Sequence, residues 1–307
     1  MKKVILFLMV ACTVLSGCTK EKTDYQADTG SNIPEHQVFK TALSFEIDGF
    51  NIEVQALNGT FYTGYNALRF IVIPTANTTE TFPVAVNFIP VLNQNGTLSS
   101  CPHAYNFESN TEENYYMGYA VFTQPSKDWN LYFKYTIGSK TYTHQERVAV
   151  QEQNNKNLHM TSFVGNDNVQ YYIALIAPQR PQVSENTLIA GIYRYDVPAA
   201  PSATIEGSFP DPQQYAYSQV KGYRLQLDPR MPEPSMGNHS SPNNRDLTQQ
   251  QNGFYEGTVN YTMTGNWTLN FIMLNQNGRI IKGTTVPKDF TPGVAGKKSE
   301  LFIDVLL

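Results

Sequence analysis

The stretches YYMGYAVFTQPSKDWNLYF (115–133) and FYEGTVNYTMTGNWTLNF (254–271) are two copies of one pattern, and together they hold both tryptophans of the chain. The copies share an aromatic residue, a glycine and a Trp-x-Leu-x-Phe motif in the same order, with one residue of slippage in the turn before the tryptophan. The matched positions are Tyr116, Gly118, Trp129, Leu131 and Phe133 in the first copy and Tyr255, Gly257, Trp267, Leu269 and Phe271 in the second. This repetition predicts two similar domains.

Apolar and polar residues alternate through both copies, which is the pattern of a half-buried strand. Trp129 and Leu131 share one strand face, and Asn130 lies on the other. Asn-Gly pairs at 95–96 and 277–278 are typical of hairpin turns, and no stretch beyond the apolar N-terminus shows a sustained helical stripe. We therefore predict an all-β fold of two tandem immunoglobulin-like β-sandwiches, with both tryptophans in the packed interior.

Composition changes divide the chain into four parts. We predict a signal peptide over 1–17, a flexible tether over 18–37, a first sandwich over 38–152 and a second sandwich over 157–307. The polar stretch QEQNNKN (151–157) separates the two sandwiches. The second sandwich carries a Pro-rich insertion (197–214), which is predicted to run extended over its surface. Gly118 and Gly257 interrupt regular strands, which indicates a bulge or the close approach of another backbone.

The N-terminus has the features of a lipoprotein signal. Lys2 and Lys3 precede an apolar run, and the tetrapeptide LSGC ending at Cys18 resembles a bacterial lipobox, which implies cleavage before Cys18 and lipidation of its thiol. The apolar run is shorter than the roughly 20 residues of a membrane-spanning helix. The alternative is an ordinary secretory signal with a chance cysteine. We predict an extracytoplasmic protein anchored through Cys18 in the bacterial cell envelope, in the outer rather than the inner membrane.

The charge balance argues against one class of partner. The chain has 22 Lys and Arg residues against 26 Asp and Glu, a net charge of −4, which becomes −6 when Lys2 and Lys3 leave with the signal. Nucleic-acid binding depends on clusters of basic residues that neutralise phosphates. Since the sequence has no such block, we expect no nucleic-acid partner.

Cys101 is the one thiol left in the mature chain, because Cys12 is removed with the signal and Cys18 is lipidated. No intramolecular disulfide is then possible. A lone thiol in an oxidising compartment is buried, paired between molecules or bound to metal. Its position matches the region around 240–241 in the second copy, which predicts partial exposure and slow labelling by a maleimide.

Two loops carry side chains that bind soft metals. In the sequence MPEPSMGNHSSP, Met231, Met236 and His239 lie within nine residues, and thioether and imidazole ligands suit Cu(I). The alternative is that the methionines plug the end of the sandwich and His239 is solvated. In the first copy, Cys101 and His103 form a weaker candidate pair, because one intervening residue lets both side chains of an extended segment point the same way.

The order of four elements in the second half resembles the YtkA-like domains and their FixH-like relatives. These elements are an Asn-x-Leu strand at 186–188, a Met-Pro loop with a histidine at 231–242, a Tyr-x-Gly strand at 255–257 and a Gly-x-Trp-x-Leu strand at 265–271. The resemblance implies an immunoglobulin-like sandwich of bacterial envelope proteins, often tied to copper handling or cytochrome oxidase maturation. The first half resembles a degenerate copy, because IPVLNQNGTLSSCPHAYNF (89–107) has lost both methionines.

Common catalytic motifs are missing from the sequence. It contains no G-x-S-x-G elbow, no H-E-x-x-H pair, no Walker loop and no dinucleotide-binding glycine turn. We therefore predict a non-enzymatic, membrane-anchored lipoprotein that binds copper, or a copper-handling envelope partner, through the Met231 loop. The alternative is a metal-free surface module that binds a glycan or another envelope protein, with Tyr215 and Tyr217 as an aromatic platform.

Overall fold

The computed structural model describes residues 38–76, 84–202 and 204–307. The predicted signal peptide, the lipidation site Cys18 and the tether lie outside these residues. Within them the regular elements are strands and three short 3-10 helices, with no α-helix, so the predicted all-β sandwich class is confirmed. No helix in the described part of the chain is long and apolar enough to cross a membrane.

Two five-stranded sheets form the first sandwich. One sheet has the order β1 (Phe39–Ile47), β2 (Phe50–Leu57), β4 (Gly64–Pro74), β8 (Tyr115–Phe122) and β7 (Glu108–Asn110). The other has the order β3 (Phe61–Tyr62), β10 (Lys140–Gln151), β9 (Ser126–Ile137), β5 (Val84–Gln94) and β6 (Thr97–Ser100). Alternate residues of both sheets face one shared apolar core.

The second sandwich is a longer sheet that folds over on itself. Its path is β11 (Met160–Val164), β12 (Gln170–Ala177), β13 (Glu185–Tyr195), β18 (Tyr255–Asn260), β17 (Arg245–Gln249), β15 (Arg224–Met231), β19 (Asn266–Leu274) and β20 (Ile280–Lys282). Three further strands pair at its sides: β14 (Tyr217–Gln219), β16 (His239–Ser240) and β21 (Leu301–Leu306). The sheet turns back on itself at β17, which pairs with both β18 and β15.

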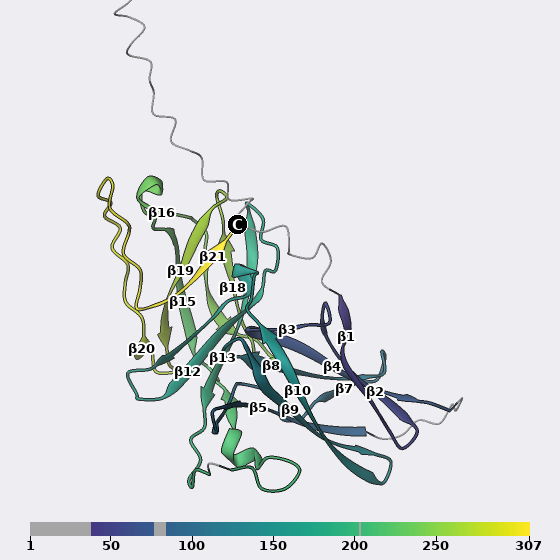
Figure 1. The fold of residues 1–307 in the computed structure, drawn as a ribbon. Helices are drawn as coiled ribbons and strands as arrows, with labels where there is room; N and C mark the ends of the chain where they lie inside the picture. The colour runs from purple at the N-terminus through teal and green to yellow at the C-terminus, as the bar shows by residue number, and fades with distance from the viewer. Residues whose placement is uncertain (1–37, 77–83, 203) are drawn as a thin grey trace, which may run out of the picture.

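The strand order repeats along the chain, as the duplicated sequence pattern predicts. The order β11-β12-β13-β18-β17 corresponds to β1-β2-β4-β8-β7, and β21-β19-β15 corresponds to β10-β9-β5. Figure 1 shows the first sandwich in purple to teal and the second in teal to yellow, meeting at an angle.

The repeated tryptophans occupy the same place in the two sandwiches. Trp129 and Trp267 are fully buried. Their indole Nε1 atoms donate to backbone carbonyls of the preceding turns, Gln124 O and Met263 O, both at 3.1 Å. A buried indole needs such a partner for its one donor. The predicted core role of both residues is confirmed.

The repeated glycines lie where a side chain has no room. A Cβ on Gly118 would overlap the ring of Phe107, and a Cβ on Gly257 would lie 2.6 Å from the carbonyl oxygen of Arg245 on the neighbouring strand. The predicted close approach of another backbone is confirmed at Gly257, whereas at Gly118 the close neighbour is a side-chain ring.

The two sandwiches share an apolar interface. Val121 and Tyr119 of β8 pack with Ala174 of β12 and Tyr193 of β13 in a cluster of their own. The rings of Tyr119 and Tyr193 lie 5.5 Å apart. This cluster joins the outer face of one sheet of the first sandwich to the second sandwich.

The Pro-rich insertion differs from its predicted surface course, because it packs on the first sandwich. Ile205, Phe209 and Tyr215 contact a cluster that includes Ile89 and Tyr132, and the short helix η2 (Pro212–Tyr215) forms part of the contact. The insertion therefore buries apolar side chains between the sandwiches, which an extended run over one sandwich would leave in water.

The polar stretch between the sandwiches is ordered by its own amide groups. Asn155 caps the short helix η1 (Lys156–Leu158) by accepting from Asn157 N, and its Nδ2 donates to Gln179 O at 2.9 Å. Asn157 Nδ2 donates to Leu306 O at 2.7 Å. Both asparagines are buried, so hydrogen bonds hold this junction where apolar residues are lacking.

Candidate functional site

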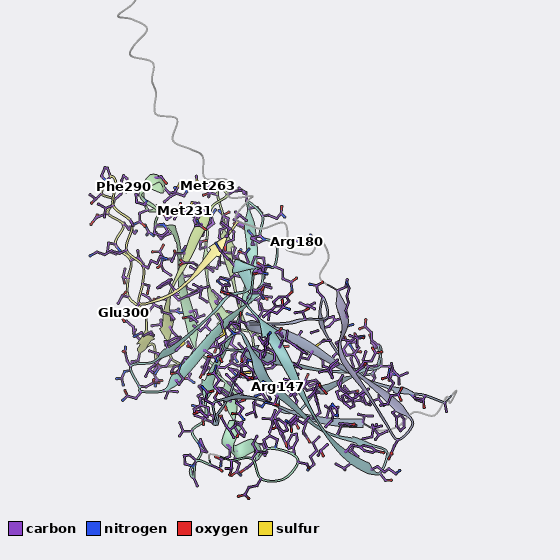
Figure 2. The ribbon with its side chains drawn as sticks, viewed as in Figure 1. Arg147, Arg180, Met231, Met263, Phe290 and Glu300 are labelled. Atoms are coloured by element: carbon purple, nitrogen blue, oxygen red, sulfur yellow. The ribbon has the colours of Figure 1, made fainter. Side chains whose placement is uncertain are left out.

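The Met231 loop brings the three predicted ligands to one end of the second sandwich. Met231 ends β15 and pairs directly across the ladder with His239 of β16, and directly opposed Cβ atoms lie roughly 5 Å apart. Met236, in the short helix η3 (Pro234–Met236), packs half-buried on the same core that contains the fully buried Met231. Figure 2 shows Met231 at the free end of the second sandwich, with Met263 and Phe290 and far from Arg147.

The imidazole of His239 is positioned by two neighbours. Its Nε2 lies 2.9 Å from Thr262 Oγ1, and its ring packs at 6.0 Å and 64° from the indole of Trp267. In the described residues no hydrogen bond is formed by its Nδ1. The ring is half-buried, so it is neither the fully solvated loop residue of the alternative interpretation nor a closed core residue.

The loop is held in place from outside by the segment between β20 and β21. Gly296 N donates to Pro232 O at 2.6 Å, and Asn238 Nδ2 donates to Pro287 O at 3.0 Å. Asn266 Nδ2 donates to Glu233 Oε1 at 2.8 Å. Gly237 and Asn238 take left-handed backbone angles, φ 63° and 52°, to turn the chain back into β16. The candidate side chains therefore lie on a loop that these hydrogen bonds hold in one conformation.

The donor set of this loop is soft. It consists of two thioethers and one imidazole, which are the ligand types that favour Cu(I). The described residues contain no group of three or more His, Cys, Asp or Glu side chains that could hold a metal ion. The two thioethers and the imidazole are donor types that would suit Cu(I) at this loop.

Cys101 contradicts the predicted exposure, because its side chain is fully buried in the core of the first sandwich. The reason is that the segment 102–105, which follows Cys101, forms backbone hydrogen bonds with β5 on one side and β8 on the other. Phe88 N donates to Tyr105 O, and Ala104 N and Val121 N donate to Tyr119 O and Pro102 O, respectively. Burial raises the pKa of the Cys101 thiol well above its usual value. The predicted slow maleimide labelling of the native protein is therefore replaced by an expectation of inertness until unfolding.

His103 is also buried, at the junction of the sandwiches. Its Nδ1 lies 2.8 Å from Cys101 O, and its ring packs edge-on against Phe88 and against Tyr217 of the second sandwich. Burial lowers its pKa to about 4, so the ring is neutral at physiological pH. Of the weaker metal candidate pair, Cys101 belongs to the core of the first sandwich and His103 lies at the junction, whereas Met231 belongs to the core of the second sandwich.

The aromatic platform predicted at Tyr215 and Tyr217 is wrong. Tyr215 is only 6% exposed, because the insertion presses it onto the first sandwich. Tyr217 donates its hydroxyl to Ser100 O at 2.8 Å and packs against the rings of Tyr172 and Tyr195. Tyr215 is therefore buried, and the half-buried Tyr217 is engaged in contacts between the sandwiches.

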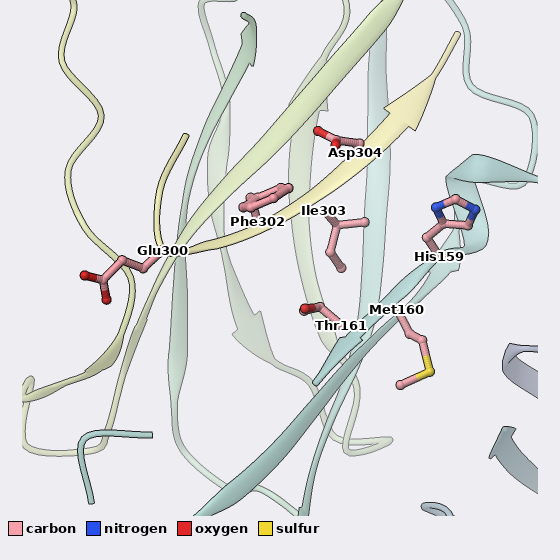
Figure 3. Close-up of a pocket in the computed structure, with 7 residues that line it drawn as sticks. All are labelled: His159, Met160, Thr161, Glu300, Phe302, Ile303 and Asp304. Atoms are coloured by element: carbon pink, nitrogen blue, oxygen red, sulfur yellow. The ribbon is translucent and has the colours of Figure 1, made fainter. Parts of the chain in front are cut away.

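A small polar hollow of about 260 Å³ lies on the second sandwich, lined by residues near the start of β11 and along β21. Figure 3 shows His159 and Asp304 on different elements of this hollow. The Asp304 carboxylate already binds Lys298 Nζ at 2.6 Å and Thr268 Oγ1 at 2.5 Å. His159 Nε2 lies 3.3 Å from Gln153 O, and burial lowers its pKa. The Asp304 carboxylate is thus already engaged by Lys298 and Thr268 within the structure.

A larger cleft of about 690 Å³ opens between the two sandwiches. Its lining combines aromatic rings with amide side chains, among them Tyr65, Tyr119, Gln219, Gln251 and Phe254. Spacing along the sequence does not indicate this cleft, because its lining comes from two distant segments, 65–119 and 218–254. The sequence does contain many tyrosines, 19 in all. The prediction placed an aromatic platform at Tyr215 and Tyr217, whereas Tyr65 and Tyr119 line the cleft.

Comparison with known proteins adds little to this geometry. No protein-family model matches the sequence, and no curated protein matches it. One solved structure with some similarity is FdeC, an Escherichia coli adhesin, at 12% sequence identity and a TM-score of 0.20. The alignment covers 77% of this chain and 60% of the adhesin chain. A similarity this low carries no information on function.

Proposed function

We propose that the chain is a membrane-anchored extracytoplasmic lipoprotein, without catalytic activity, that binds Cu(I) through Met231, Met236 and His239. The observation that carries this proposal is the direct pairing of Met231 with His239, with Met236 packed on the same core. Residues that are spread over nine positions in sequence thereby meet at one end of the sandwich. The YtkA-like order of motifs supports the same function.

The surroundings of the loop suit the cuprous ion. Thioether sulfur is a neutral, polarisable ligand that does not form disulfides in an oxidising compartment. Trp267 and the buried Met231 provide an apolar wall, which favours a weakly hydrated monovalent ion over a strongly hydrated divalent one. When bound, copper would supply a soft cation that a partner protein of the envelope could accept; His239 and the two methionines would hold it.

The test is a titration of the full chain, solubilised in detergent, with Cu(I) under competition from bicinchoninate. We expect sub-micromolar binding of one ion. The variant Met231→Leu/Met236→Leu/His239→Asn should lose it, because leucine keeps the buried volume of methionine but lacks the sulfur.

A matched control is Met263→Leu, which removes a 37% exposed methionine at the same end of the molecule. Its affinity for Cu(I) should equal that of the unaltered chain. Absence of binding by the unaltered chain, or equal binding by the triple variant, would contradict the proposal.

A further inference from the structure

The interdomain cleft has the size and position of a small-molecule binding site. Its volume of about 690 Å³ falls within the roughly 300–1,000 Å³ typical of ligand pockets, which occur preferentially at domain interfaces. Tyr65 and Tyr119 contribute from the first sandwich, and Gln219, Gln251 and Phe254 contribute from the second. The cleft therefore exists only when the two sandwiches are docked.

Aromatic rings form one wall of the cleft. Tyr65 and Tyr119 stack at 5.5 Å and 24°, and Phe254 meets Tyr65 edge-to-face at 5.8 Å and 87°. All three rings line the cleft and are half-buried, so part of each remains exposed. Tyr65 and Tyr119 also pack on the buried interface cluster around Tyr193. The wall is thus preformed, and a ligand pays little to order it.

The polar lining carries unengaged hydrogen-bonding groups. The exposed side chains of Glu108, Lys221 and Gln251 make no hydrogen bond or ion pair within the described parts of the chain. Glu108 and Lys221 carry opposite charges, so the lining has no net charge. A polyanion or a phosphate group would need a surplus of basic residues here, and the cleft does not supply one.

The backbone beside the cleft is closed to strand addition. Ala104 N donates to Tyr119 O on one side of the segment 102–107, and Phe107 N donates to Val86 O on the other. An extended peptide that binds by adding a strand needs free backbone groups along an edge. A ligand in the cleft along this segment therefore meets side chains rather than an open ladder.

From this lining we infer that the interdomain cleft binds a neutral saccharide. Aromatic rings offer flat apolar faces for the C–H side of a sugar ring, and unengaged amide groups such as that of Gln251 can exchange hydrogen bonds with its hydroxyls. The absence of net charge in the lining suits an uncharged ligand. This inference does not depend on copper, since the Met231 loop lies at the other end of the second sandwich.

The experiment is isothermal titration of the full chain, in a detergent without a sugar headgroup, with cellohexaose, maltohexaose, xylohexaose and chitohexaose. We expect at least one of these neutral hexasaccharides to bind with a micromolar to millimolar Kd. Phe254→Ala should weaken that binding about tenfold through loss of a ring contact. Gln251→Ala should weaken it about fivefold through loss of one hydrogen bond.

The control is Phe290→Ala, which removes a 47% exposed phenylalanine outside the cleft and should leave the affinity unchanged. Gln251 is exposed, so its variant keeps the test valid if Phe254→Ala disturbs the interface. The inference is overturned if no neutral hexasaccharide binds, if binding survives both cleft variants, or if only a polygalacturonate or a peptide binds. Cu(I) should not alter the saccharide affinity, so this result and the copper titration can fail independently.

Discussion

At the residue scale, Asn66 and Asn186 make matching hydrogen bonds at the start of corresponding strands in the two sandwiches. Asn66 Oδ1 accepts from Tyr62 N at 2.9 Å, and its Nδ2 donates to Tyr62 O at 2.6 Å and Gly64 O at 2.9 Å. Asn186 makes the same three bonds to Gln182 N, Gln182 O and Ser184 O. Only a side chain with a donor and an acceptor on one amide can close this turn before the strand.

Replacing this asparagine should be costly in the first sandwich. Asn66→Ala leaves three backbone groups without partners at a buried position, and we expect a loss of about 2–3 kcal/mol in the free energy of unfolding. Asn186 is more exposed, so Asn186→Ala should cost about 1 kcal/mol, because water can replace part of the lost bonding. Urea unfolding measures both. Equal losses in the two variants would show that burial does not set the difference.

His103 should make the protein sensitive to acid. Its folded pKa of about 4 lies below the unfolded value of 6.5, so the unfolded chain binds the proton first as the pH falls. The contribution of His103 to stability is therefore complete above pH 6.5 and is lost by up to about 3 kcal/mol as the pH falls to 4.

Thermal unfolding between pH 4 and 7 measures this effect. The matched variant His103→Asn keeps an N–H donor near Cys101 O but does not titrate, so its stability should fall less over the same range. A parallel fall in the two proteins would assign the acid sensitivity to other groups.

At the scale of elements, the insertion and η2 act as a clasp between the sandwiches. Tyr215 is the buried anchor of this contact, and it packs with Ile89, Val91 and Tyr132 of the first sandwich. The side chains that meet here come from the first sandwich on one side and from the insertion and η2 on the other. This contact complements the tyrosine cluster around Tyr193 and gives the pair of sandwiches a second point of attachment.

Removing the anchor should loosen the clasp. Tyr215→Ala is expected to cost about 3 kcal/mol, the scale of a large buried side chain, and to split a single calorimetric transition into two. Tyr215→Phe provides the control, because the buried hydroxyl has no hydrogen-bond partner within the described residues. The Phe variant should stay within about 1 kcal/mol of the unaltered chain. An Ala variant that still unfolds in one transition of unchanged midpoint would show that the clasp is dispensable.

At the scale of the whole molecule, the interface is built from tyrosines whose hydroxyls are taken out of water. Burial raises the pKa of Tyr119 to about 12 and also raises the pKa values of Tyr65 and Tyr193. A charged phenolate is disfavoured in such a place, so the docked arrangement requires all of these groups to be protonated. The saccharide cleft, which needs both sandwiches, shares this requirement.

The interface should therefore open in alkali. The folded pKa values are raised above the unfolded value of 10.0, so the unfolded chain loses its protons first. Stability is complete below about pH 10 and declines as the pH rises toward 12. Thermal unfolding from pH 8 to 11.5 should show the decline, and Tyr193→Phe should lessen it by removing one phenol. A decline that is the same in this variant would place its origin outside the tyrosine cluster.

Local patterns determined what the sequence alone could predict. Strand alternation, the Asn-Gly turns and the repeated tryptophans and glycines act over a few residues, so spacing along the chain identifies them. The meeting of Met231 and His239 also follows from a short hairpin-like return of the chain. For the same reason the all-β sandwich class and the buried roles of Trp129 and Trp267 could be predicted.

Contacts between distant segments decided the rest. Cys101 is buried because its segment is bonded on both sides to β5 and β8, and Tyr215 is buried because the insertion reaches across to Ile89. The cleft joins Tyr65 to Phe254, which are separated by most of the chain. No sequence spacing encodes these pairings, since they arise when each sandwich buries apolar surface against the other. The tertiary structure alone therefore decided which aromatic residues are buried and which line the cleft.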